Sequence, residues 1–182
     1  MEEIILTLAK VAILVALDEP TDFNLTSALS EYPQLKEQGA VFVTLRKEGA
    51  LRGCIGSLQA HRPLYRDIIS NAQSSALRDS RFVPLRKEEL PKIKIEVSLL
   101  SKPQKVDYKN QDDLKEKIRA NIDGVVLEID NHRATYLPSV WEELPKFDQF
   151  FGSLCLKAKL DKNCLAKHPN ISIYQATKYK EK

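Results

Sequence analysis

The sequence predicts an α+β fold in which antiparallel strands are flanked by helices. Runs rich in β-branched and aromatic residues occur in pairs joined by short turns, as in antiparallel hairpins. Segments with apolar residues at every third or fourth position, as in amphipathic helices, separate these pairs. Because a hairpin and a helix recur in both halves, we expect one domain over residues 1–182. Its two lobes would share one sheet system and divide near residue 105.

Length and composition agree with a soluble globular chain. Of its 182 residues, 43% are hydrophobic and 29% are charged, which is ordinary for such proteins. The 28 basic and 25 acidic residues are mixed along the chain and give a net charge of +3. Such a balance argues against nucleic acid as a partner. The apolar run over residues 4–17 contains Lys10 and is too short to cross a membrane, so we expect no membrane partner.

The elements of the first half follow from local patterns. Residues 4–17 predict a buried helix that ends before Pro20. Residues 40–46 and 51–58 predict two strands of a hairpin, joined by a turn over residues 47–50 in which Gly49 supplies a positive φ. Pro63 begins an amphipathic helix, and the alternation over residues 93–100 predicts a further strand. The apolar face of that helix contains Leu64, Ile68, Ile69, Ala72, Ala76 and Leu77.

The second half repeats these kinds of element. We expect a helix over residues 112–120 and a second hairpin whose strands, 124–130 and 133–137, are joined through Asn131 and His132. Ser139 can cap a helix that begins at Val140. Residues 147–160 predict another helix and residues 171–179 the last strand.

One stretch of the first hairpin is the best candidate for a functional site. Residues 51–56, Leu-Arg-Gly-Cys-Ile-Gly, place two glycines around a cysteine inside a strand; we call them the Cys54 motif. Glycine weakens a strand, so two of them indicate a bulge or the close approach of another backbone or a ligand. Gly53 and Gly56 are therefore candidate binding residues.

Cys54 has two interpretations. As a nucleophile, its thiolate would be favoured by the basic neighbours Arg52 and His61. Alternatively it is a small buried hydrophobe, and we favour this reading because free cysteine is among the most buried residue types. Cys155 and Cys164 lack nearby partners in the sequence and are not catalytic candidates. Three widely spaced cysteines and the absence of a signal peptide indicate a reducing cytoplasm.

A charged group follows the helix that begins at Pro63. Arg78, Asp79 and Arg81 could bind an anionic substrate, or they could form an ion pair that ties the helix end to the sheet. We place the structural role slightly ahead. The histidines His61 and His132 and the third, His168, are scattered without metal-ligand spacing, so we expect neither a metal nor a cofactor.

These residues carry a resemblance to a known family. The Cys54 motif, together with residues 75–82 (Ser-Ala-Leu-Arg-Asp-Ser-Arg-Phe) and 89–91 (Glu-Leu-Pro), resembles the AMMECR-type domain family. The likeness continues through residues 96–100, 124–125 and 134–138. Residues 140–145 and 154–158 are similar to the bacterial and archaeal branch, protein A of the AmmeMemoRadiSam system. Ser80 stands where many members of that branch have proline.

The resemblance implies an intracellular α+β domain with two lobes and no established activity. It also implies an association with a Memo-type protein and a radical S-adenosylmethionine protein in prokaryotes. The Cys54 motif then marks a site without giving a role to Cys54.

Two functional hypotheses follow, and the residues leave open whether the chain is an enzyme. The first is an enzyme or enzyme component that acts on a small anionic molecule in a cleft around the Cys54 motif. The alternative is a non-catalytic scaffold for a Memo-type partner. The candidate catalytic residues are Cys54 and His61, and the candidate binding residues are Arg52, Gly53, Gly56, Arg78, Asp79 and Arg81.

Overall fold

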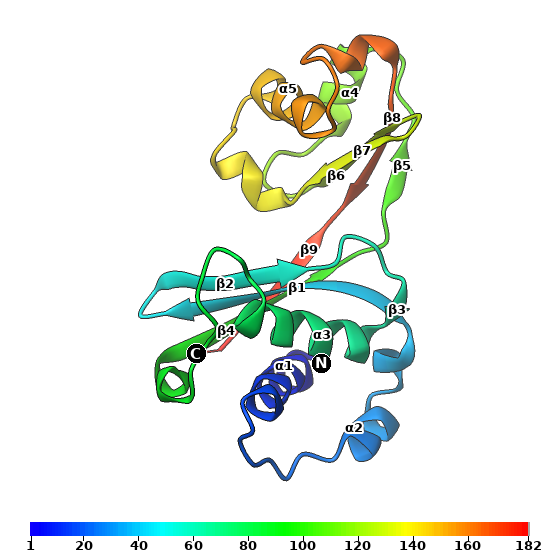
Figure 1. The fold of residues 1–182 in the computed structure, drawn as a ribbon. Helices are drawn as coiled ribbons and strands as arrows, with labels where there is room; N and C mark the ends of the chain where they lie inside the picture. The colour runs from blue at the N-terminus through cyan, green and yellow to red at the C-terminus, as the bar shows by residue number, and fades with distance from the viewer. Residues whose placement is uncertain (182) are drawn as a thin grey trace. The chain divides into compact units, whose positions relative to one another are not determined.

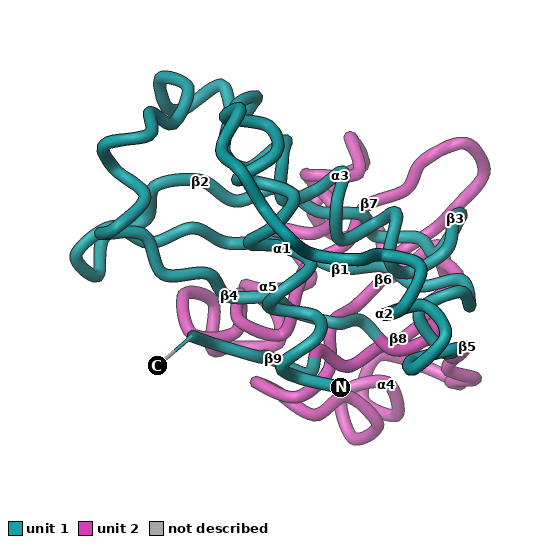
Figure 2. Tube along the Cα trace, turned by 90° about the horizontal axis from the view of Figure 1, so that it is seen from below, with its two compact units in different colours: residues 1–100, 177–182 teal, residues 101–176 magenta. Residues whose placement is uncertain are grey.

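The computed structural model describes residues 1–181 and shows two compact units (Figure 1). Unit 1 contains residues 1–100 and the chain end from residue 177, and unit 2 contains residues 101–176. Figure 2 shows that the end of the chain is coloured with unit 1, although it follows unit 2 in the sequence. No helix within residues 1–181 is long and apolar enough to cross a membrane.

The sheet of unit 1 contains the predicted hairpin. Its strand order is β2 (Ala50–Gly56), β1 (Gln38–Lys47), β4 (Ile93–Leu100) and β9 (Ala176–Lys180), and the short β3 (Arg62–Pro63) also pairs with β1. The β1–β2 pair is antiparallel, which confirms the hairpin. Both turn residues, Glu48 and Gly49, have positive φ angles, of 52° and 85°, as the tightest hairpin turns require.

The hairpin contains a β-bulge within the Cys54 motif. Leu45 pairs with Gly53 whereas Arg46 pairs with Leu51, so Arg52 is the extra residue. A bulge bends its strand and re-aims the side chain that it carries. Arg52 therefore leaves the simple alternation of the strand.

Two helices, α1 (Glu2–Ala16) and α3 (Leu64–Leu77), pack on one face of this sheet (Figure 1). The predicted apolar face of α3 is buried at Ile68, Ala72 and Ala76. Side chains from the sheet and both helices form one core, which includes Ile5, Leu8, Val41, Val43, Leu45 and Ile68. The smaller elements of unit 1 are α2 (Leu25–Glu31) and the 3₁₀ turns Pro33–Lys36 and Lys87–Lys92.

Unit 2 has its own sheet and core. The strand order is β5 (Gln104–Val106), β8 (Asn170–Tyr174), β6 (Gly124–Ile129) and β7 (His132–Tyr136), with every pair antiparallel. The helices are α4 (Gln111–Lys117) and α5 (Phe147–Lys157), and 3₁₀ turns cover Pro138–Glu142 and Cys164–Lys167. In the core, the rings of Phe150 and Trp141 stack with centroids 3.6 Å apart.

The strands therefore form two sheets, and the expectation of one shared sheet system was wrong. Residues 171–179, predicted as one strand, are divided at Gln175 into β8 of one sheet and β9 of the other. The backbone of Gln175 leaves the ladder and exchanges two hydrogen bonds with Ser101, of 2.8 and 2.9 Å. Apolar periodicity shows where strands occur but not which strands pair, so the break was not visible in the sequence.

Two smaller predictions in unit 2 also need correction. The turn of the second hairpin is Asp130-Asn131 and not Asn131-His132, because Ile129 pairs with His132 and Asp130 takes the positive φ of 51°. The turn at Val140 is a 3₁₀ helix over Pro138–Glu142, and no side chain caps it, so Ser139 has no capping role. Pro138 instead occupies the first turn, where its fixed φ suits a helix start.

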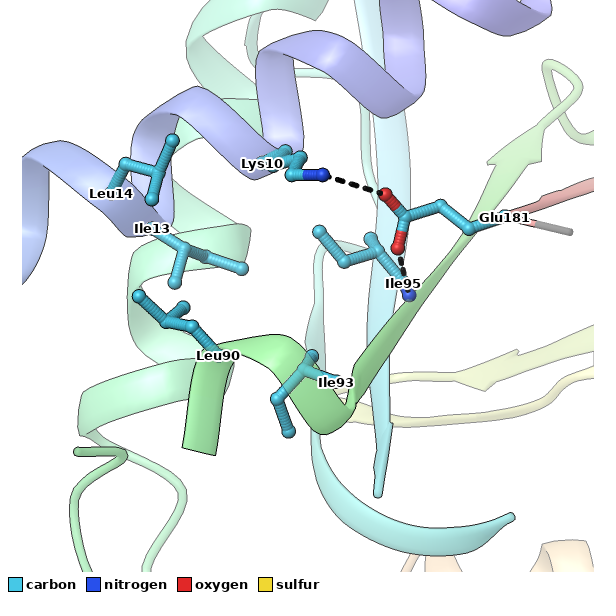
Figure 3. Close-up of a pocket in the computed structure, with 7 residues that line it drawn as sticks. All are labelled: Lys10, Ile13, Leu14, Leu90, Ile93, Ile95 and Glu181. Atoms are coloured by element: carbon cyan, nitrogen blue, oxygen red, sulfur yellow. Dashed lines mark hydrogen bonds and ion pairs between the residues drawn. The ribbon is translucent and has the colours of Figure 1, made fainter. Parts of the chain in front are cut away.

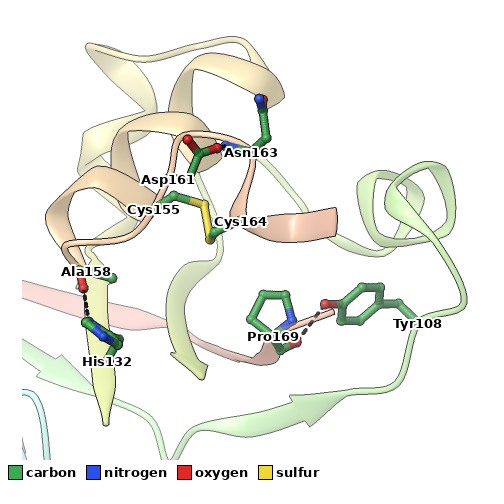
Figure 4. The surroundings of a disulfide bond; sticks show 8 residues. All are labelled: Tyr108, His132, Cys155, Ala158, Asp161, Asn163, Cys164 and Pro169. Atoms are coloured by element: carbon green, nitrogen blue, oxygen red, sulfur yellow. Dashed lines mark hydrogen bonds between the residues drawn. A yellow bond between two sulfur atoms is a disulfide. The ribbon is translucent and has the colours of Figure 1, made fainter. Parts of the chain in front are cut away.

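Cys155 and Cys164 form a disulfide, so the expectation that they lack partners was wrong (Figure 4). Their sequence separation of nine residues covers the end of α5 and a tight loop that turns back onto it. Both cysteines are fully buried. This pairing removes the argument for a reducing compartment that rested on the number of cysteines.

Candidate functional site

The glycines of the Cys54 motif allow two close contacts inside unit 1. A Cβ added at Gly53 would overlap the backbone carbonyl oxygen of Ser75, in α3. A Cβ added at Gly56 would overlap the ring of Phe42, in β1. Both glycines are therefore needed for packing within the chain, because even an alanine would enter occupied space.

Ser75 joins the two strands of the hairpin. Its hydroxyl accepts a hydrogen bond of 2.9 Å from the Ile55 backbone N–H and donates one of 2.7 Å to the carbonyl of Val43. Since Val43 and Ile55 are partners in the β1–β2 ladder, the hydroxyl lies at the seam between the strands. This position explains why α3 must approach so closely to Gly53.

Cys54 is held at both of its backbone groups. Its N–H donates to Asp79 Oδ2 at 2.8 Å, and its carbonyl accepts from Arg81 Nη2 at 3.2 Å. Because β2 is an edge strand, these groups would otherwise face solvent or another chain. The thiol is half-buried, with Sγ 3.2 Å from the hydroxyl of Thr44.

Asp79 and Arg81 form the ion pair that the sequence suggested. Arg81 donates to the carboxylate from Nε at 2.9 Å and from Nη2 at 2.7 Å. Asp79 is buried, and these hydrogen bonds from Arg81, followed by the N–H of Cys54, hold its pKa far below the usual range. The pKa of Arg81 is raised, mainly by the hydrogen bond to Asp79. The pair ties the end of α3 to β2, whatever else it does.

Arg52 is also paired within the chain. Its Nε and Nη2 donate to the two carboxylate oxygens of Glu89, each at 3.0 Å, which is the strong bidentate arrangement. Lys47 adds a third bond of 2.9 Å to Glu89. Arg52 and then Lys47 lower the pKa of Glu89 to about 2. Only 9% of Arg52 is exposed, so its guanidinium is used to fix the Lys87–Lys92 turn against the hairpin.

A second buried carboxylate, which the sequence reading missed, anchors the start of α3. The Asp67 side chain is fully buried and accepts four hydrogen bonds of 2.7 to 2.9 Å. The donors are the Val41 backbone N–H, the Ser57 hydroxyl, the Arg62 guanidinium and the Asn71 amide. Together these bonds fasten α3 to β1 and to the end of β2.

The signal for this network was present in the spacing of α3. Residues 67, 71, 75 and 79 are Asp, Asn, Ser and Asp, each four positions from the next. Residues four apart share one helix face, so the first three form a polar stripe beside the apolar stripe of α3. Asp79 continues this stripe just beyond the end of the helix. Because β2 and β1 offer backbone donors and acceptors there, the stripe is buried and satisfied.

The structure does not gather all the predicted site residues. His61 is exposed and its Nδ1 lies 3.0 Å from the carbonyl oxygen of Gln59. Arg78 is exposed at the end of α3, and no contact joins it to another charged residue in the part described. Cys54, Asp79 and Arg81 are in contact, whereas Arg52 turns to Glu89.

A small pocket in unit 1 contains none of these residues (Figure 3). It measures about 60 Å³, enough for only one or two water molecules. Lys10 and Glu181 close one side with an ion pair of 3.9 Å, and Glu181 also accepts from the Ile95 N–H at 2.9 Å. The remaining lining is apolar. The Cys54 motif is therefore a better candidate site than this pocket.

The pairing of Glu89 and Asp79 predicts acid sensitivity. Both carboxylates have a pKa below the ordinary value of about 4 for the unfolded chain. Their stabilisation is thus complete above about pH 5 and is lost as the pH falls toward about 2. We expect the free energy of unfolding to decrease through this range. The slope should be smaller for Arg52→Met, which removes the two hydrogen bonds from Arg52 to Glu89 and leaves only the bond from Lys47 among the side-chain donors. Urea unfolding at a series of pH values measures both slopes, and equal slopes would contradict the assignment.

Comparison with known proteins gives one consistent result. A family model described as AMMECR1 matches residues 6–179. A Saccharolobus islandicus protein is 38% identical over 148 residues, which cover 75% of this chain and 63% of that protein. A Methanothermobacter thermautotrophicus protein is 36% identical over 141 residues, which cover 77% of this chain and 73% of that protein. The chain thus spans less than two thirds of the length of the first of these relatives.

A solved structure has the same fold. The crystal structure of an uncharacterised protein from Pyrococcus horikoshii superimposes with a TM-score of 0.82 and 30% sequence identity. The match covers 99% of this chain and 91% of the other. The predicted α+β class and the family resemblance are both confirmed.

Proposed function

We propose that this chain, which belongs to the AMMECR1 family, is a protein-binding module with its docking surface around the Cys54 motif. The observation that carries the proposal is that the polar groups of the motif are used inside the chain. The backbone of Cys54 is held by Asp79 and Arg81, and Arg52 is held by Glu89. The motif then acts by fixing a surface and not by exposing a reactive group.

The residues that flank these contacts are exposed. We call Leu51, Arg78, Ser80, Arg81 and Val83 the Cys54 surface. Leu51 is 39% exposed and Val83 is 70% exposed, and 54% of the Arg81 side chain is accessible. Arginine is enriched in the energetically important part of protein interfaces.

This surface is held in place before any partner binds. Arg81 is fixed by Asp79, and the guanidinium groups of Arg81 and Arg52 lie over the Phe82 ring, with their Cζ atoms 5.5 Å and 5.9 Å from its centroid. Side chains that are already ordered lose less entropy on binding. The exposed guanidinium groups of Arg78 and Arg81 favour acidic groups on the partner. We propose a Memo-type protein as that partner, since the resemblance associates the two.

The test is to purify the Memo-type protein from the same genome and to measure its affinity for the wild-type chain and for the Arg78→Glu variant. Arg78 has no charged partner among the described residues, so its reversal breaks no ion pair there. We expect binding to weaken by about tenfold or more, as for a reversed charge at the centre of an interface. Lys36→Glu, an exposed reversal in Pro33–Lys36, is the matched control and should bind as wild type. Equal affinity of Arg78→Glu and wild type, or no binding at micromolar concentration, would contradict the proposal.

A second candidate function is supported by the thiol of Cys54. It is the free cysteine of the structure and is half-buried beside Thr44. The guanidinium of Arg81 lies next to this residue, since its Nη2 donates to the Cys54 carbonyl at 3.2 Å. A thiol in such a basic setting would suit an enzyme or enzyme component that acts on a small anionic molecule.

Alkylation distinguishes this candidate from the binding module. Cys155 and Cys164 are in a disulfide, so iodoacetamide applied without reductant reports on Cys54 alone. Labelling of the native protein, located by mass spectrometry and absent in Cys54→Ser, would support a reactive thiol. Labelling only after unfolding would exclude it.

A further inference from the structure

A pocket in unit 2 combines both signs of charge with an apolar floor. It measures about 250 Å³ and lies between α5, the first residue of α4 and the loop before Cys164–Lys167. Phe151 and Leu165 are buried and supply the apolar part. This pocket belongs to a different unit from the Cys54 surface, so the inference does not depend on the proposed function.

The polar groups of the pocket have no partners within the described residues. Asp148 and Lys162 both line it, and neither takes part in an ion pair or a side-chain hydrogen bond in residues 1–181. The side-chain amides of Gln111 and Asn163 line it as well and are likewise without protein partners there. A carboxylate, an ammonium and two amides are thus available to a ligand in one small space.

Gly152 gives Lys162 its position. A Cβ added at Gly152 would lie 3.1 Å from Lys162 Cγ and 3.2 Å from Lys162 Cε, so the lysine side chain runs directly across the glycine. Glycine inside a helix lowers helix stability. Here it provides the space in which the stem of an exposed lysine lies flat on α5.

The disulfide fixes the other wall of the pocket. Lys162 and Asn163 immediately precede Cys164, whose sulfur is bonded to Cys155 of α5 (Figure 4). Asp161 closes the same loop, since its side chain accepts the Asn163 N–H at 2.8 Å and its carbonyl accepts the Cys164 N–H at 2.9 Å. The loop is therefore held against the helix, and a ligand need not order it.

We propose that this pocket binds a zwitterionic small molecule of the amino-acid type with an apolar side chain. Lys162 binds the carboxylate of the ligand, and Asp148 binds its ammonium group. Both side chains can do so because they form no ion pair with each other or with another described residue. The apolar side chain of the ligand packs on Phe151 and Leu165. The amides of Gln111 and Asn163 can donate to or accept from either end.

Titration calorimetry with L-leucine and two analogues tests the proposal. 4-Methylpentanoate lacks the ammonium group, and 3-methylbutylamine lacks the carboxylate. We expect L-leucine to bind with a dissociation constant in the millimolar range or below, and each analogue to bind at least about tenfold more weakly. No heat of binding up to about 20 mM L-leucine, or equal affinity for an analogue, would overturn the assignment.

Variants separate the pocket from the rest of the surface. Lys162→Met keeps the stem over Gly152 and removes the charge, and Asp148→Asn removes the opposite charge. Each should weaken L-leucine binding by about tenfold or more. Lys167→Met and Asp112→Asn change exposed charges that do not line the pocket and should leave it unchanged.

Gly152→Ala is a third variant of the pocket, and it keeps both charges. Alanine favours the helix, so the variant should fold, yet its methyl group must shift the stem of Lys162 by a few tenths of an ångström. We expect this folded variant to bind L-leucine more tightly than Lys162→Met does, because the ammonium group is retained. If Lys162→Met and Asp148→Asn bind L-leucine as tightly as wild type, the proposed site is wrong.

Discussion

Gly53→Ala is expected to lower the free energy of unfolding of unit 1 by more than about 3 kcal/mol. The added methyl group would overlap the carbonyl oxygen of Ser75, which is backbone and cannot rotate away as a side chain would. To make room, α3 must move off the hairpin. That movement breaks the bonds from the Ser75 hydroxyl to Val43 and Ile55, which join the two strands.

Gly49→Ala is the matched control for this prediction. Nothing lies within 4 Å of a Cβ at Gly49, but its φ of +85° strains any residue with a side chain. Its cost should therefore be about 1 kcal/mol and arise from backbone conformation alone. Urea unfolding followed by far-ultraviolet circular dichroism compares the two variants, and an equal loss of stability in both would show that Ser75 does not need the bare glycine.

Asp67→Ala is expected to cost a similar amount, about 3 to 5 kcal/mol. The carboxylate is fully buried and accepts four hydrogen bonds, so its removal leaves the Val41 N–H without an acceptor and the Arg62 guanidinium without its counter-charge. An unpaired charge or donor in a buried position is more costly than a lost surface contact.

The control for Asp67 is an aspartate that makes no such contacts. Asp22 is exposed, and among the described residues it has no hydrogen-bond or ion-pair partner. Asp22→Ala should change the free energy of unfolding by no more than about 0.5 kcal/mol. If Asp67→Ala is equally mild, the network around Asp67 does not hold α3 to the sheet.

The hairpin and α3 could be predicted because their signals are local. Gly49 indicated the tight turn, and the strands on either side of it pair with each other. The helix after Pro63 was visible in the spacing of Ile68, Ala72 and Ala76, all of which are buried. Such elements need no knowledge of distant residues.

Features that depend on distant residues were not predictable in this way. The division at Gln175 depends on a hydrogen-bonded partner, Ser101, that lies 74 residues away. The pairing of Cys155 with Cys164 depends on a loop that returns to its own helix, and apolar periodicity does not describe loops. Sequence patterns identify elements, whereas the pairing of elements is decided by packing.

The Cys54 motif is a constrained stretch of backbone, and its constraint comes from within the chain. Two glycines indicated a close approach, and the approaching groups are Ser75 and Phe42 of the same chain. Basic residues near Cys54 suggested a ligand site, yet Arg52 and Arg81 are paired with Glu89 and Asp79. Their partners could have been found only by combining the polar stripe of α3 with the glutamate of the Glu-Leu-Pro segment.

The side chains of Ser75 in α3 and of Asp79, two residues beyond its end, hold the backbone of the Cys54 motif at the edge of the sheet. Hydrogen exchange of the Cys54 amide, resolved by NMR in wild type and in Asp79→Ala, tests this claim most directly. We predict a protected amide in wild type, because it donates to a buried carboxylate at 2.8 Å. In Asp79→Ala this amide should lose its protection while the Ile55 amide, bound to Ser75, keeps it. A Cys54 amide that exchanges in wild type as fast as an open edge strand would contradict the account.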